Sequence, residues 1–207
     1  MMGVKFVFVA FGAAAAALVG LQLSGDSGLA TIDVITEHEV LEKHLAPFAE
    51  SVVGDLPGYR GHMYRVLSYT LFQLGSAEHI EAISMALVFH DLGLWTDNDL
   101  AYIEPSVSRA TNYMTEKEVA PETMQLVNDL IASHHKVTPF TGPHADVVEA
   151  FRKADLTDFS LGLLQSVGRH NVAKVMAALP NAGFHLSLIR LVTTLPKPWT
   201  IATIFRW

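Results

Sequence analysis

The chain has 207 residues, half of them hydrophobic, with a formal net charge of −7 and no cysteine. This length suits one domain with extensions and is sufficient for a substantial core. The acidic balance argues against general binding of nucleic-acid polymers, and the absence of thiols excludes disulfides, thiolate metal sites and cysteine nucleophiles.

An uncharged apolar stretch of eighteen residues runs from Phe6 to Leu23, between Lys5 and a polar Ser-Gly-Asp-Ser-Gly run. Its length borders on that of a membrane span. Small residues at 28–30 also suit signal-peptide cleavage, and a buried or tail helix is the third interpretation. We expect residues 1–30 to be a signal or membrane-anchor segment, which makes the protein membrane-associated or exported; the alternative location is cytoplasmic.

Helical spacing of apolar side chains recurs through most of residues 31–207, whereas alternating strand patterns are scarce. We predict that this part of the chain forms a single all-α domain. Its first informative helix opens at Gly61 and continues to Leu74, with His62 in the first turn. Arg65 lies on the same face, because residues three apart in a helix are neighbours.

The next helix is predicted over Ser76 to Phe89, with the serine as N-cap and Gly93 just beyond the end. It stops at the adjacent pair His90 and Asp91. Two neighbouring residues cannot share one helical face, but a fraying last turn can direct both side chains to a common point.

Two further helical patterns carry polar residues of interest. The first follows Tyr102 and has Glu104 in its first turn, and the second runs from Pro121 to the pair His134 and His135. Neighbouring helical side chains point about 100° apart, so we expect at most one histidine of the pair to face a site, and we choose His134. Glu104 and His134 also suit ordinary helix-end roles, stabilised by the helix dipole.

The last pattern with polar chemistry covers Ala150 to Phe159 and places Asp155 in largely apolar surroundings. A carboxylate there is costly unless it is paired or bound to a metal. Further on, Phe184 to Trp207 mixes apolar residues with tryptophans that suit a membrane interface. Packing of this stretch back onto the domain is the favoured interpretation.

The order of His62, then His90 and Asp91, then Asp155 resembles the motif of the HD superfamily of metal-dependent phosphohydrolases. That motif is a histidine, a His-Asp doublet and a distant aspartate. The surrounding sequences here are GHMYRV, HDLG and KADLTD, and the resemblance covers residues 58–159. It implies an HD-domain-like helical bundle in which these four residues bind a metal ion.

The implied ligand shell of two imidazoles and two carboxylates suits Zn, Mn, Fe, Co or Ni. We expect one divalent transition metal ion, because residues 92–133 contain no histidine, whereas di-iron HD oxygenases and HD-GYP proteins use additional histidines in this interval. Water bound to such an ion has a pKa of about 7 in good zinc sites. The chemistry implied is therefore attack of water on a polarised centre.

The resemblance also implies roles around the metal. Asp91 is expected to be catalytic as well as a ligand, and His134 to be catalytic, either lining the substrate pocket or binding a second metal. Arg65 and Lys136 are the best candidates for binding a substrate phosphate. A local resemblance of residues 102–114 to the cyanamide hydratase-like branch implies that Glu104 acts as a pocket acid or base.

The leading functional hypothesis is hydrolysis of a small phosphate ester or nucleotide by metal-bound water. Its rival is zinc-dependent hydration or hydrolysis of a small neutral nitrogen compound. A di-iron oxygenase is less favoured for want of ligands, and a non-catalytic helical binding protein is the option outside enzymes. The expected partner is a small-molecule substrate, with membrane association through the N-terminal segment.

Overall fold

The computed structural model describes residues 30–52, 54–195, 198–203 and 205. Within these ranges the chain is helical and contains no strand, which confirms the all-α prediction. The elements in chain order are α2 (Glu39–Leu45), η2 (Ala46–Val52), α3 (Leu56–Leu74), α4 (Ile80–Phe89), α5 (Gly93–Thr96), α6 (Ile103–Glu116), α7 (Pro121–Ser133), α8 (Ala145–Phe159), α9 (Arg169–Ala178), α10 (Phe184–Thr194) and η3 (Pro198–Thr203).

Residues 1–29 of the predicted signal or membrane-anchor segment (1–30) lie outside these ranges. Across the described ranges, no helix has both the length and the apolar character that crossing a bilayer would require.

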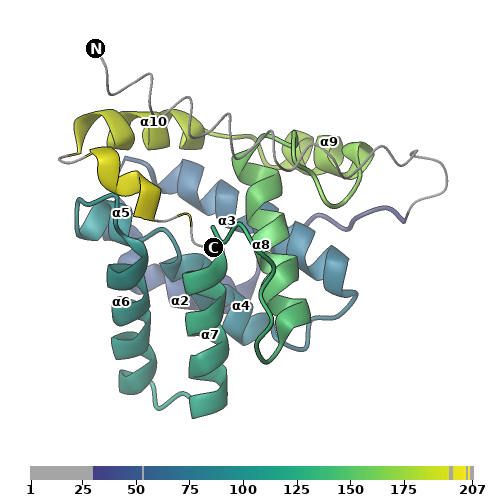
Figure 1. Ribbon diagram of the computed structural model, residues 1–207. Helices are drawn as coiled ribbons and strands as arrows, with labels where there is room; N and C mark the ends of the chain where they lie inside the picture. Colours follow the sequence, from purple (N-terminus) through teal and green to yellow (C-terminus); the bar gives the residue numbers. More distant parts are fainter. Residues whose placement is uncertain (1–29, 53, 196–197, 204, 206–207) are drawn as a thin grey trace.

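Helix α3 forms the centre of the bundle. It packs against α8 and α4, while α7 packs against α4, α6 and α8. Helices α9 and α10 form a layer across one end of this arrangement, at the top of Figure 1, and both contact α3. The interior is filled by side chains from each of the central helices, such as Leu67, Leu87, Leu130 and Phe151. This packing brings polar residues far apart in sequence to one interior point.

Helix α3 begins earlier than the apolar pattern predicts. Pro57 occupies one of its first two positions, where a missing N–H costs nothing because those donors have no partner within the helix. The helix ends at Gly75, whose φ of 64° is the left-handed conformation that favours glycine. His62 consequently lies in the second turn rather than the predicted first turn.

Helix α4 ends where the sequence predicts but begins later. The hydroxyl of Ser76 accepts the N–H of Glu78 at 3.1 Å, which stabilises a local turn instead of an N-cap, and the helix starts at Ile80. Its last residue is Phe89. The N–H of His90 still donates to the carbonyl of Ala86 at 2.8 Å, so the helical path fixes where the His-Asp doublet leaves the helix.

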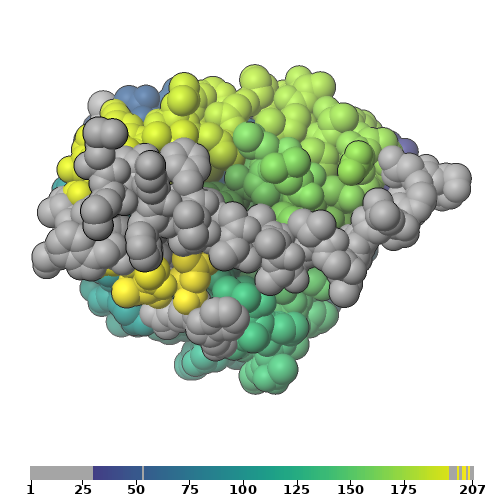
Figure 2. All heavy atoms as spheres, turned by 45° about the horizontal axis from the view of Figure 1, so that its top comes forward, coloured from purple at the N-terminus to yellow at the C-terminus, as the bar shows by residue number. Residues whose placement is uncertain are grey.

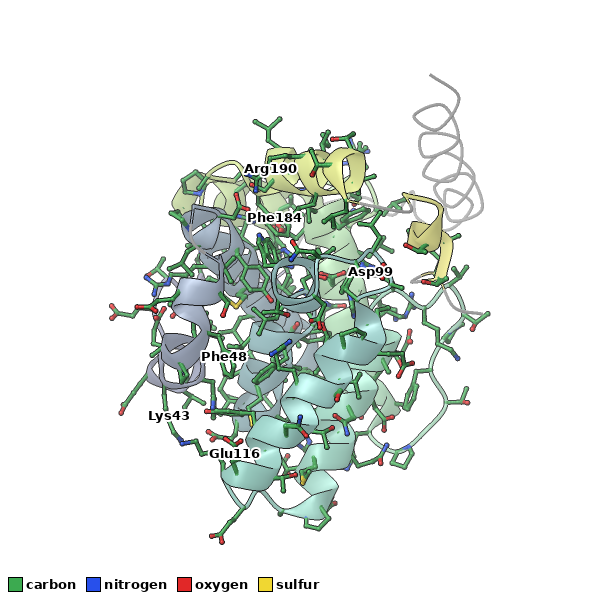
Figure 3. The ribbon with its side chains drawn as sticks, turned by 90° about the vertical axis from the view of Figure 1, so that its left-hand side faces the viewer. Lys43, Phe48, Asp99, Glu116, Phe184 and Arg190 are labelled. Carbon is green, nitrogen blue, oxygen red and sulfur yellow. The ribbon has the colours of Figure 1, made fainter. Side chains whose placement is uncertain are left out.

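The contact of α3 with α10 depends on a glycine. A Cβ atom added at Gly58 would lie 2.9 Å from the backbone nitrogen of Phe184 and 3.1 Å from the carbonyl oxygen of Ala182. The absence of that atom lets the two backbones approach closely. Phe184 is thereby placed on the inner side of α10, toward the body of the bundle (Figure 3), where it is buried.

The described part of the C-terminal stretch packs back onto the domain. Leu191 of α10 joins a small core with Leu94, Leu100, Tyr102 and Ile103, and Phe205 packs against it. This confirms the favoured interpretation for these residues. The side chain of Trp199 and all of Trp207, which prompted the membrane-interface alternative, lie outside the description.

Candidate metal centre

The four residues predicted as metal ligands converge in the interior of the bundle. His62 comes from α3, His90 and Asp91 follow α4, and Asp155 comes from α8; all four are buried. The Nε2 atom of His62 lies 3.0 Å from Nε2 of His90 and 3.4 Å from Oδ1 of Asp155. Oδ2 of Asp91 lies 3.3 Å from Nε2 of His90 and 3.9 Å from Nε2 of His62.

Three of these four separations, 3.0, 3.3 and 3.4 Å, match those expected around one transition-metal ion, and the fourth, 3.9 Å between Asp91 and His62, is longer. Ligand atoms about 2.0–2.2 Å from a shared ion lie about 3 to 3.5 Å from one another. His62, His90 and Asp91 meet the geometric requirement for holding one ion, and Asp155 lies beside them. His62 and Asp91 are 29 positions apart in the sequence, and the fold brings them together.

Hydrogen bonds at the other ring nitrogens determine how both histidines face this point. Nδ1 of His62 lies 2.7 Å from Oδ2 of Asp158, and Nδ1 of His90 lies 2.8 Å from the carbonyl oxygen of Leu87. Because both partners accept hydrogen bonds, each Nδ1 carries the hydrogen, and in the neutral rings the two Nε2 lone pairs point at each other. Lone pairs 3.0 Å apart repel unless a proton or a metal ion lies between them.

Without a metal, a proton on Nε2 of His62 relieves the repulsion between the two Nε2 lone pairs. Burial alone lowers the pKa of His62, but hydrogen bonds and negative charge from Asp155 and Asp158 outweigh burial and raise this pKa to about 9. A metal ion that binds near pH 7 must therefore displace the proton on His62.

Asp91 and Asp155 are ionised because neighbouring histidines stabilise their charged forms. Burial raises the pKa of a carboxyl group, but the surrounding histidines outweigh burial at both acids and hold their pKa values below the ordinary value. His90 and His134 do so at Asp91, and His62 does so at Asp155, chiefly through a hydrogen bond. Both groups are thus available as anionic ligands.

A second donor group shares Asp91 with the first and includes both His134 and His135. Nε2 of His134 lies 3.5 Å from Oδ1 of Asp91, and Nδ1 of His135 lies 3.7 Å from Oδ2 of Asp155. The expectation that at most one histidine of this pair faces the site is wrong. Helix α7 ends at Ser133, and His134, its C-cap, keeps a helical backbone; both rings can face the centre because each reaches a different acid, Asp91 for His134 and Asp155 for His135.

The environments of these two histidines suit metal ligands. Nδ1 of His134 donates to the carbonyl oxygen of Ile131 at 2.6 Å, so Nε2 is the atom that faces Asp91; burial lowers the pKa of His134, but Asp91 and Asp155 outweigh burial and raise it. The pKa of His135 is lowered to about 3 by burial and by the nearby His134, so this ring is neutral at physiological pH. The hydroxyl of Tyr102 hydrogen-bonds Nε2 of His135 at 2.8 Å and directs its Nδ1 toward Asp155.

Unsatisfied polar atoms mark the same point. Oδ1 of Asp91, Oδ2 of Asp155 and Nε2 of His134 are buried and have no hydrogen-bond partner. Each such atom costs about 1–3 kcal/mol when it stays unpaired. Three in one small volume fit a bound cation, and the mixed nitrogen and oxygen donors fit a divalent transition metal. The residues present therefore fit the predicted cofactor class.

Arg65 does not serve as a free phosphate-binding group. Its guanidinium is fully buried and forms a two-point ion pair with Asp158, through Nε at 2.5 Å and Nη2 at 2.9 Å. Its remaining nitrogen, Nη1, donates to the carbonyl oxygens of Leu179 and Pro180. The predicted substrate-binding role is corrected to a positioning role, because every guanidinium nitrogen is already engaged within the protein.

Glu104 is also placed differently from the expectation. It lies in the first turn of α6, is exposed, and belongs to neither donor group. Tyr102, at the N-cap of the same helix, is the residue that reaches the site. Two positions along a helix correspond to a rotation of about 200°, so inward placement of Tyr102 directs Glu104 outward.

Lys136 follows His135 in the turn after α7 and is partly buried. Its carbonyl oxygen accepts a hydrogen bond from Arg152, which fixes the backbone of this turn. After the correction of Arg65, Lys136 is the remaining predicted contact for a substrate phosphate.

Aromatic rings enclose the centre. Phe184 stacks on His62 with ring centroids 4.2 Å apart, and Phe205 lies 5.8 Å from His135 by the same measure. Tyr59 donates to the carbonyl oxygens that precede the His-Asp doublet, at 3.2 Å to Leu87 and 3.0 Å to Val88. These rings lie beside residues that are themselves buried, and the low local dielectric of a buried site strengthens electrostatic interactions.

Comparison with known proteins gives no match to any protein-family model, curated protein or solved structure. The HD resemblance therefore stays an expectation that rests on the motif residues.

Proposed function

We propose that this protein is a metal-dependent hydrolase of the HD type that acts on a small phosphate ester or nucleotide. The observation that supports it best is the pair of facing Nε2 atoms of His62 and His90, with unsatisfied carboxylate oxygens beside them. A buried group of this kind is expensive to maintain in a protein that binds no cation.

The ligands of the proposed ion are His62, His90, Asp91 and Asp155. A bound divalent ion supplies an acidified water as nucleophile and neutralises charge on the substrate oxygens. The second donor group of Asp91, His134 and His135 lies beside it and suits a second, weaker ion, which would replace the expectation of a single ion. Two ions held by these residues would favour phosphate esters as substrates, because they would neutralise more negative charge than one ion.

The remaining residues of the chain position these groups. Asp158 orients His62, and Tyr102 orients His135. Lys136 is the proposed contact for the phosphate, as a point charge rather than a bidentate fork. The aromatic residues around the centre limit the substrate to a small molecule.

The test combines metal analysis with a substrate panel. Purified full-length protein is analysed for bound metal and assayed with phosphomonoesters, nucleotides and nitriles. We expect phosphate release that falls at least about 100-fold in Asp91→Asn, because this change removes a ligand of both donor groups. The matched control is Asp129→Asn on α7, which lies outside both groups and should leave activity unchanged. Low metal content with equal activity of all three proteins would contradict the proposal.

A second candidate is hydration or hydrolysis of a small neutral nitrogen compound at one zinc ion. The engagement of Arg65 by Asp158 and the aromatic surroundings favour it, since both reduce the need for a charged substrate. Turnover of a nitrile without phosphatase activity would select this candidate.

A di-iron oxygenase predicts oxygen consumption, and a non-catalytic binding protein predicts neither metal nor turnover. Membrane attachment through residues 6–23 stays a prediction, tested by fractionation of the full chain.

A further inference from the structure

The large hydrophobic side chains exposed in the described part of the chain gather in one region. Leu161 is 55% exposed, Leu163 87%, Leu186 72% and Ile189 57%. The first two lie in the turn after α8, and the other two lie three residues apart on α10 and therefore share a face. Scattered exposed leucines need no explanation, but a group of four in one region does.

The turn after α8 lies against both α9 and α10. The carbonyl oxygen of Phe159 is 3.0 Å from Nε2 of His185 on α10, and a Cβ added at Gly162 would lie 2.7 Å from the side chain of Val172 on α9. Figure 2 looks onto this layer and shows the residues after α8 adjoining α9 and α10. We call the surface formed by residues 160–168, α9 and α10 the α9/α10 face.

The backbone of the turn is held in a conformation that presents the leucines outward. Leu161 has a φ of 54°, in the left-handed region that a branched side chain rarely adopts. The turn is fixed by the N–H of Leu161 donating to Asp158 at 2.9 Å and that of Gly162 to Thr157 at 2.8 Å. An unfavourable conformation that exposes an apolar side chain suggests a use for it.

The charge of this part of the chain is opposite to that of the rest. Residues 159–207 contain no aspartate or glutamate, and they contain five basic residues: Arg169, Lys174, Arg190, Lys197 and Arg206. The net charge is thus +5 over residues 159–207 and −12 over residues 1–158, which together give the −7 of the chain. Three of the five are described on this face: Arg169 and Lys174 are exposed on α9, although Lys174 donates to the carbonyl oxygen of Ile32, and Arg190 is exposed on α10, although it pairs with Asp55. A basic face with exposed leucines complements an anionic lipid surface.

The N-terminal part of the chain joins the fold at this same face. Asn171 of α9 donates to the carbonyl oxygen of Ala30 at 3.1 Å and accepts the N–H of Ile32 at 2.9 Å. The uncharged apolar stretch 6–23 is therefore only a short segment away from α9 along the chain. Any membrane attachment through that stretch would bring the α9/α10 face close to the bilayer.

We propose that the α9/α10 face binds the surface of an anionic phospholipid membrane, with the four leucine and isoleucine side chains inserted among the lipids. A second copy of the chain is a poorer occupant, because a two-fold interface would oppose the basic residues of one face to those of the other. The proposal does not depend on the metal centre, which lies in the interior on the other side of α10.

The first test measures sedimentation of the full chain with vesicles. Vesicles of phosphatidylcholine containing about one third phosphatidylserine are compared with pure phosphatidylcholine. We expect preferential binding to the anionic vesicles, weakened by salt, and a loss of at least about tenfold in Leu186→Glu with Ile189→Glu. The control is Asn112→Asp with Gln125→Glu, which adds the same charge at exposed positions of α6 and α7 and should bind as the unchanged chain does.

The second test locates the contact and uses the absence of cysteine in the chain. A polarity-sensitive dye is attached at Leu163→Cys, and at Gln125→Cys as the control. Anionic vesicles should shift the emission of the first to shorter wavelength and leave the second unchanged.

Three outcomes would overturn the proposal. The first is equal vesicle binding by both double variants, which would assign membrane contact to another part of the chain. The second is no vesicle binding by the unchanged protein. The third is a dimer in solution that Leu186→Glu with Ile189→Glu dissociates without any lipid effect, because this would identify a second copy as the occupant.

Discussion

Arg65 and Asp158 form a buried ion pair that supports the candidate metal centre without belonging to it. Nε and Nη2 of Arg65 bind the two oxygens of Asp158, and one of these oxygens also accepts the hydrogen of Nδ1 of His62 at 2.7 Å. The pair therefore sets both the orientation of the His62 ring and the nitrogen that carries its hydrogen. Residues that hydrogen-bond a metal-binding histidine commonly increase metal affinity by about 10- to 100-fold.

Asp158→Asn should weaken metal binding by about 10- to 100-fold, and it should also destabilise the fold by about 3–5 kcal/mol, because buried Arg65 loses its counter-ion. The amide leaves the volume unchanged but removes the charge that fixes His62. Affinity is measured by competition with a chelator of known strength. Asp146→Asn, at an exposed position in the first turn of the same helix, is the control and should bind metal normally. Equal affinity of both variants would show that Asp158 does not position the ligand.

Metal affinity should increase with pH. The pKa of His62 is raised from 6.5 to about 9 in the folded, metal-free protein, so a proton must leave before the nitrogen can bind metal. Below pH 9 the apparent affinity should fall about tenfold per pH unit, and about one proton should be released per ion bound. Titration calorimetry in buffers of different ionisation enthalpy measures that proton directly.

The free energy of unfolding of the metal-free protein should decrease with pH, opposite to the metal affinity. A raised pKa means that the folded state binds the proton more tightly, so this contribution is complete below pH 6.5 and is lost as pH rises through about 9. Urea unfolding in the presence of a chelator should therefore give a lower free energy of unfolding at pH 9 than at pH 7. A stability that does not change over this range would contradict the proton held between His62 and His90.

The sequence predicts the helical class because apolar periodicity is a local signal, whereas the convergence of His62, His90, Asp91 and Asp155 could be expected only from the resemblance of their order to the HD motif. Local signals place helix ends poorly. Helix α4 begins at Ile80 rather than Ser76, since the serine hydroxyl prefers a local turn.

The supporting residues are harder to predict because they depend on side-chain direction in the folded state. Asp158 lies one turn after Asp155 on the same helix, and that spacing of three was the available signal. His135 could not be distinguished from His134 without knowing that each ring reaches a different acid. Arg65 also shares a helix face with His62, but only the tertiary fold shows that Asp158 already binds it.

The chain should bind two metal ions of unequal affinity. The second donor group has three candidate ligands, and His135 is partly exposed, so the second ion should be the weaker. His134→Ala with His135→Ala should reduce the stoichiometry from two to one. His79→Ala with His144→Ala removes another histidine pair, with ring centroids 5.3 Å apart, and should leave both ions bound. One ion in the unchanged protein would restrict the centre to the first group.

Tyr102→Phe should lower the rate of the proposed hydrolysis by up to about tenfold with little change in stability. The substitution removes only the hydroxyl that hydrogen-bonds His135, and a single such bond contributes about 1 kcal/mol. The ring remains to fill the small core beside α10. A pH–rate profile of the variant separates this effect from misfolding, which would lower the rate equally at every pH.

Gly58→Ala should destabilise the protein by about 1–3 kcal/mol, although alanine is the better helix former. In an exposed helix the same change would stabilise by about 0.5–1 kcal/mol. Here the added methyl group would meet the backbone of Phe184 at 2.9 Å, and a backbone cannot rotate away as a side chain can. Helix α10 must then move outward and carry with it the Phe184 ring that stacks on His62. Denaturant unfolding and metal competition on the same variant should therefore both show losses, and a loss of stability with unchanged metal affinity would show that α10 does not help to position His62.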